Sequence, residues 1–174
     1  MKAKSKKQTD LINLIDNMGE DIDEILDNEL SDKYFEGIVL AYTFIENILK
    51  YVIFLKLAWD QIQIDVEKGI PPQDNFNRIM EKCRELSFYQ AHKKALELNL
   101  IDEKLESKIF QIRNERNDLL HQFWLYRHRK NSKLLKRNLT RLIQPARKIL
   151  KIFEKMVMTI GVEEVFDTFF FKEK

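Results

Sequence analysis

Apolar residues recur every three or four positions along most of the chain, which is the period of an amphipathic helix. Eight of them between Leu11 and Leu26 predict a first helix near residues 9–29. A second, more continuously apolar run follows Ser31, which we expect to cap a helix that ends near Trp59. The apolar residues of this run predict the central helix of a core.

The second run also resembles a membrane span in its length and apolar character. It carries four polar or charged residues inside the apolar stretch: Glu46, Asn47, Lys50 and Lys56. Ionisable groups are costly inside a bilayer. We therefore expect a buried helix of a soluble protein and no membrane association.

The rest of the chain predicts further helices separated by short breaks. The clearest break lies around Gly69, Pro71 and Pro72. Helices are expected over residues 76–86, 87–98, 100–127 and 133–160, with Asp74 or Asn75, Ser87, Asp102, and Asn131 with Ser132 at or near their starts. No alternating strand pattern is present. The pattern predicts a single all-α domain over residues 1–174, a bundle of about five to six helices with a basic, flexible N-terminus (1–8) and a terminal helix or tail (162–174).

Composition supports this fold class and a reducing environment. The chain has only four Gly and three Pro, which suits long helices with short connections. Its single cysteine, Cys83, excludes an intramolecular disulfide and a cysteine-based zinc site. The basic N-terminus leads into no apolar segment, so we expect no signal peptide and a cytoplasmic location.

The net charge of +2 conceals a separation of charge along the chain. Residues 10–36 contain ten acidic residues and one base, Lys33, whereas residues 119–153 contain ten bases and no acid. Such a layout fits either polyanion binding at one end or solvated helix faces. The two interpretations remain open on charge alone.

The segment RNDLLH, residues 116–121, lies within the long predicted helix. On an ideal wheel with Arg113 at 0°, Arg116, Asn117 and His121 fall at about −60°, 40° and 80°. The apolar residues between about −40° and 60° are Ile109, Leu120, Trp124 and Phe110. Because an unpaired buried guanidinium is costly, we expect these polar residues to line a cleft or meet partners across an interface.

These residue types suit metal-independent cleavage of RNA. Arginine binds a phosphate through a forked contact and can stabilise the extra charge of a phosphorane. Histidine can transfer a proton near neutral pH, and Asn117, one turn before His121, can orient it. The 2′-OH of RNA would attack its own phosphate. No metal-binding or phosphate-loop motif is present, so we expect no metal and no cofactor.

A structural interpretation competes with the catalytic one. Arg, Asn and His can occur within six residues of a charged helix without forming a site. In that case Arg116 and His121 would only support the fold. His92, in a short helix without an evident partner, and His128, in a basic run, are interpreted as structural.

The segment RNDLLH resembles the RNxxxH motif of the HEPN superfamily, whose members include toxins and phage-defence nucleases. The segment ALELNLIDEKLESKIFQIRNERNDLLHQFW resembles the long motif-bearing helix of that family, and YTFIENILKYVIF, with Glu46, resembles an earlier one. The resemblance spans roughly Tyr34 to Lys151, but only six residues carry the specific motif. It implies an all-α bundle that dimerises and brings two motifs into one composite ribonuclease cleft.

By this resemblance His121 would be the general acid and base, Arg116 would stabilise the scissile phosphate, and Asn117 would orient the histidine or the RNA. Arg113 has no counterpart in the motif and is added from the wheel as a phosphate contact. Phe123 stands where toxins controlled by a nucleotidyltransferase carry tyrosine, so modification at that position is excluded. A stand-alone abortive-infection effector, or the toxin of a toxin–antitoxin pair with another inhibitor, fits better.

Basic residues after the motif are candidates for an RNA-backbone track that adds salt-sensitive affinity. These are Arg127, Arg129, Lys130, Lys133 and Arg137, with Arg141 beyond them. The acidic residues at positions 10–36 could shield this track or meet it on a second subunit. The leading hypothesis is a homodimeric endoribonuclease. The alternatives are a non-catalytic HEPN-like module that binds RNA or a protein, and a plain helical scaffold.

Overall fold

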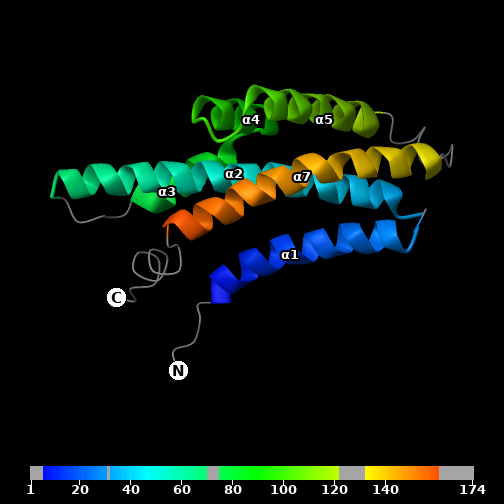
Figure 1. Ribbon diagram of the computed structural model, residues 1–174, viewed down its shortest axis with the longest axis horizontal. Helices are drawn as coiled ribbons and strands as arrows, with labels where there is room; N and C mark the ends of the chain where they lie inside the picture. Colours follow the sequence, from blue (N-terminus) through cyan, green and yellow to red (C-terminus); the bar gives the residue numbers. More distant parts are fainter. Residues whose placement is uncertain (1–5, 31, 70–74, 122–131, 161–174) are drawn as a thin grey trace.

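The computed structural model describes residues 6–30, 32–69, 75–121 and 132–160. The described residues form helices and no strand, which confirms the all-α prediction. The helices are α1 (Lys6–Asp27), α2 (Tyr34–Glu67), α3 (Asn75–Glu85), α4 (Phe88–Glu97), α5 (Glu103–His121) and α7 (Ser132–Ile160). Figure 1 shows α2 crossing α7 in the middle of the bundle, with α4 and α5 on one side and α1 on the other.

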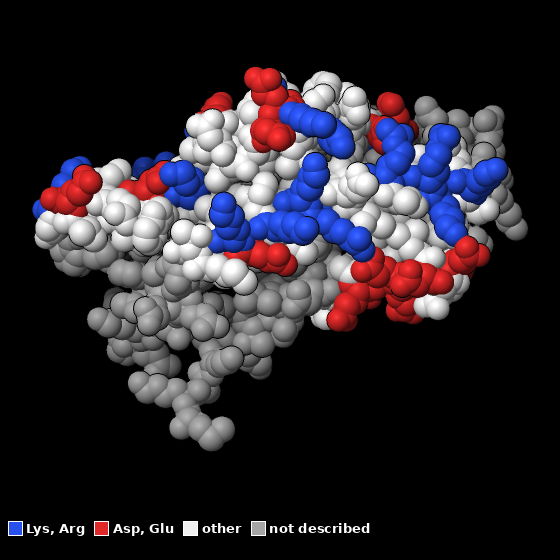
Figure 2. Space-filling view, viewed as in Figure 1, with Lys and Arg blue, Asp and Glu red and all other residues white. Residues whose placement is uncertain are grey.

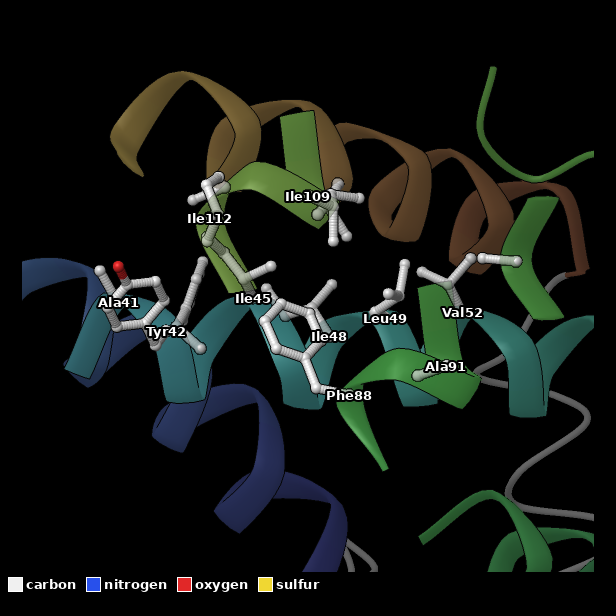
Figure 3. Close-up of a cluster of buried hydrophobic side chains, with 14 of the residues drawn as sticks. Ala41, Tyr42, Ile45, Ile48, Leu49, Val52, Phe88, Ala91, Ile109 and Ile112 are labelled. Carbon is white, nitrogen blue, oxygen red and sulfur yellow. The ribbon is translucent and has the colours of Figure 1, made fainter. Parts of the chain in front are cut away.

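Helix α2 is the centre of the core, as its apolar sequence predicts. It packs most extensively against α7 and also contacts α1, α3, α4 and α5. Ile45, Ile48 and Leu49 are fully buried in a cluster that also contains Ile109 and Ile112 of α5 and Ala91 of α4 (Figure 3). Buried residues occur on most sides of α2, so the helix has no continuous face exposed to solvent.

The apolar length of α2 also meets the length and composition of a membrane span. Its most apolar 18-residue window has a mean hydropathy of 1.7, yet 61% of that window is buried inside the protein. The polar residues within the helix have partners on the protein: Lys50 contacts Glu46, and Lys56 contacts Asp60. Burial against the other helices therefore accounts for the apolar sequence of α2.

The predicted helix starts are confirmed at two places. Ser87 caps α4 in a capping box: its hydroxyl accepts a hydrogen bond from the Gln90 amide, and the Gln90 side chain accepts one from the Ser87 amide. The carboxylate of Asp102 accepts a hydrogen bond of 2.6 Å from the Leu105 amide at the start of α5.

Other predicted boundaries differ from the structure. Helix α1 begins at Lys6, so residues 6–8 are helical rather than part of a flexible terminus. Lys33 precedes α2 without a side-chain capping bond, and Ser31 lies outside the described residues. Helix α2 runs to Glu67 instead of ending near Trp59, because its last turns still bury Ile62 and Asp65. The predicted features at residues 122–131 and 161–174 also lie outside the described residues.

Candidate functional site

The RNDLLH segment forms the described end of α5, where that helix runs beside α2. Arg116 is half-buried and continues the buried side of α5 formed by Ile109 and Ile112. Asn117 is exposed and lies outside the buried arc of α5, in contrast to Arg116. The backbone of His121 belongs to α5, and its side chain lies outside the described part of the chain.

The orientation of the buried arc explains this difference. Leu105, Ile109 and Ile112 are buried, and on the wheel they lie near −80°, −40° and −100°. Phe110, expected inside the arc, retains 39% of its exposure. The arc is therefore turned away from Asn117 and toward Arg116, which makes Arg116 the motif residue closest to the core.

Arg116 meets an acidic partner on α2. One guanidinium nitrogen, Nη1, lies 3.7 Å from Oε2 of Glu46. The other carboxylate oxygen of Glu46 lies 2.9 Å from Nζ of Lys50. The side chain of Glu46 is only 20% exposed, so two cations compensate its partial desolvation. The ion pair places the Arg116 guanidinium next to α2.

A second polar cluster lies next to this pair, where α2, α5 and α7 meet. Glu115, the neighbour of Arg116, forms a 3.0 Å ion pair with Arg141 of α7. Tyr42 of α2 is buried near them, and burial, followed by the Glu115 charge, raises the pKa of its phenol far above the usual range. The end of α5 is thus attached to both α2 and α7 by charged residues.

Arg113, which the sequence suggests as a phosphate contact, lies against two aromatic rings. Its guanidinium carbon lies 4.9 Å from the centre of the Tyr89 ring and 5.3 Å from that of Phe110. These distances are typical of cation–π contacts. Arg113 is therefore held against two aromatic rings between α4 and α5, with a planar face already in use.

His92 has a partner that its sequence neighbourhood does not reveal. Its ring is completely buried, and Nδ1 lies 3.0 Å from Oε1 of Glu106 on α5, an oxygen that also lies 3.0 Å from Nζ of Lys93. Neither imidazole nitrogen completes a hydrogen bond with the described residues. Burial lowers the pKa of His92, and Glu106 opposes that shift. His92 is therefore a buried residue of the α4–α5 contact whose burial favours the neutral form.

This burial predicts a loss of stability in mild acid. Because the folded state favours neutral His92, its contribution is complete above the ordinary pKa of 6.5 and declines as the pH falls below that value. Glu106 reduces the effect, whereas Lys93 and Arg113 add to it. Urea unfolding at pH 8 and pH 5.5 should show a smaller pH-dependent loss for His92→Phe than for wild type. Equal pH dependence of the two proteins would contradict this assignment.

The described part of the predicted RNA track lies on α7. Lys133 and Arg137 are exposed and line an open groove bordered by α1, α5 and α7. Figure 2 shows Lys and Arg side chains gathered over α7, with Asp and Glu side chains of α1 beside them. Arg127, Arg129 and Lys130 lie outside the described residues.

Acidic residues of the N-terminal part cover only some of these cations. Glu29, just after α1, pairs with Lys136, and Asp23 lies 3.8 Å from Arg147. The hydrogen bond from Lys136 lowers the pKa of Glu29. The acidic N-terminal segment thus contacts the basic helix α7 within one chain, through Glu29 and Asp23. In the described residues, neither Lys133 nor Arg137 forms an ion pair.

The fold and these contacts define the protein as an all-α helical bundle with a basic groove and an arginine-bearing helix end. Within the described ranges, no group of three His, Cys, Asp or Glu residues could hold a metal ion. No protein-family model, curated protein or solved structure matches the chain.

Proposed function

We propose that the protein is a metal-independent endoribonuclease of the HEPN type that acts in the cytoplasm as a toxin or abortive-infection effector. The observation that carries the proposal is the position of Arg116, held by Glu46 at the end of α5, one residue before exposed Asn117. The RNDLLH motif, the all-α bundle and the cations of α7 support it.

In the proposed reaction the 2′-oxygen of a ribose attacks the adjacent phosphorus while the bond from phosphorus to the 5′-oxygen of the next nucleotide breaks. His121 accepts the 2′-OH proton, and a second copy of His121, from the other subunit of a dimer, donates one to the departing 5′-oxygen. Arg116 stabilises the charge of the phosphorane. The products are a 2′,3′-cyclic phosphate and a 5′-OH, so no external reactant is needed.

The decisive experiment incubates purified protein with a labelled single-stranded RNA in EDTA. We expect cleavage that leaves a cyclic phosphate, and we expect no cleavage of DNA of the same sequence. The His121→Ala variant, purified identically, controls for contaminating ribonucleases and should leave the RNA intact. Intact RNA with wild type, or equal cleavage by the variant, would refute the proposal.

The composite cleft requires two chains, and light scattering tests this directly. A dimer is expected at micromolar concentration, and a strict monomer that still cleaves RNA would exclude the two-histidine cleft. An inhibitory partner such as an antitoxin would be expected to cover the end of α5.

The second candidate is a non-catalytic module that binds RNA. The observation that favours it is the basic groove itself, whose exposed Lys133 and Arg137 can contact phosphates without any catalytic group. This candidate predicts salt-dependent RNA binding and no cleavage. The EDTA assay combined with a binding measurement distinguishes the two functions.

A further inference from the structure

Two aromatic rings remain exposed side by side where α4 meets α5. Tyr89 is 47% exposed and Phe110 is 39% exposed, although large aromatic side chains are usually buried. The Arg113 guanidinium lies over both of them, at 4.9 and 5.3 Å. Tyr89, Phe110 and Arg113 form what we call the aromatic shelf. Core packing does not account for rings that stay in contact with solvent.

The buried His92 ring contacts both rings of the shelf. The imidazole meets Tyr89 edge to face at 5.2 Å between ring centres and Phe110 at 6.1 Å, and it is itself completely buried. Oε1 of Glu106 lies 3.0 Å from Nδ1 of His92. Rings that are fixed before a ligand arrives lose less side-chain entropy on binding. The shelf is thus a preformed surface.

Two residues of the shelf, Phe110 and Arg113, lie on α5 shortly before the RNDLLH motif. Phe110, Arg113 and Asn117 fall within an arc of about 60° on α5, and Asn117 is exposed. The backbone of His121 follows Arg113 by eight residues, which is about 12 Å along the helix axis. A strand of RNA whose phosphate lies at the motif can therefore place a nearby base over the shelf.

We propose that the aromatic shelf stacks an unpaired base of single-stranded RNA close to the scissile phosphate. This inference rests on the proposed ribonuclease function and adds the substrate class, since bases inside a duplex cannot offer a free face. Aromatic rings stack on any base, and arginine adds a cation–π contact and attraction to phosphate. A second copy of this chain is a weaker occupant, because the shelf carries a cation that a self-contact would place near its own equivalent.

The test measures binding to 2′-O-methyl oligonucleotides, which cannot be cleaved by 2′-OH attack. Wild type, Tyr89→Ala and Phe110→Ala are compared by fluorescence anisotropy on an intact strand and on an abasic strand of equal length and charge. Each alanine variant should bind the intact strand about ten-fold more weakly, the loss expected for one stacked base, and the abasic strand as wild type does. Tyr89→Phe and Phe110→Tyr keep the rings and should bind normally.

The matched control is Met158→Ala, which removes an 83% exposed apolar side chain from α7 and should leave affinity unchanged. Equal losses on intact and abasic strands, or no loss in either alanine variant, would overturn the shelf. If an alanine variant is monomeric in light scattering but binds RNA with wild-type affinity, the proposed role of the shelf would also be overturned. The shelf would then be an interface between two copies of the chain. Base-dependent binding without cleavage would refute the ribonuclease alone, whereas His121-dependent cleavage without base-dependent binding would refute the shelf alone.

Discussion

Replacing Arg116 with alanine is expected to lower the rate of cleavage of single-stranded RNA by about 10²- to 10³-fold, the effect of removing one donor to a developing oxyanion. The guanidinium is the only motif side chain whose partner the described structure shows, and that partner, Glu46, holds it at the end of α5. Single-turnover cleavage of a labelled oligonucleotide measures the chemical step. Arg116→Lys should recover only part of the rate, since an ammonium lacks the planar fork.

Glu46 is expected to act through Arg116 as a positioning residue. Glu46→Gln should slow the chemical step less than Arg116→Ala does, and it should add almost nothing in the Arg116→Ala background because the two act as a pair. Arg78→Ala, which removes an exposed arginine from α3, is the matched control and should cleave at the wild-type rate. Normal cleavage by a stably folded Arg116→Ala protein would contradict the role of this residue.

Local signals in the sequence predict most of the fold. Apolar spacing locates the helices, and the Ser87–Gln90 pair is a capping box that depends on residues three positions apart. Helix ends that depend on contacts with distant residues cannot be predicted from the local sequence. Helix α2 continues past Trp59 to Glu67, and tertiary packing still buries Ile62 and Asp65 in these last turns, which a local sequence window does not reveal.

The site shows the same division. The wheel correctly gives Arg116 a place beside apolar residues, but its partner Glu46 lies on another helix and enters the sequence argument only through a family resemblance. Arg113 was expected to contact phosphate, and the aromatic rings against it belong to α4 and α5. The sequence does not reveal a partner for His92, because Glu106 lies on α5 and approaches His92 only when α5 packs against α4. Polar pairs across helices have no fixed spacing to detect.

Lys133 and Arg137, the exposed cations of the α7 groove that form no ion pair with the described residues, are expected to set the salt dependence of RNA binding. Each contact between a protein cation and a phosphate of a single strand contributes a slope of about −0.7 to log K against log salt. Changing both Lys133 and Arg137 to Gln should therefore reduce the slope by about 1.4 and weaken binding about 60-fold at roughly 50 mM salt. The difference should nearly vanish toward 1 M salt, where counterion release no longer favours binding.

Anisotropy titrations with a 2′-O-methyl strand over a salt series measure this slope without cleavage. A double variant that changes Lys82 and Lys104 to Gln removes the same net charge from exposed positions on α3 and α5 and is the matched control. If both double variants weaken binding equally, the effect is one of net charge and α7 is not a track. Lys136 and Arg147 already contact Glu29 and Asp23, so substituting them should change the slope less. An equal change would show that RNA displaces the acidic segment from α7.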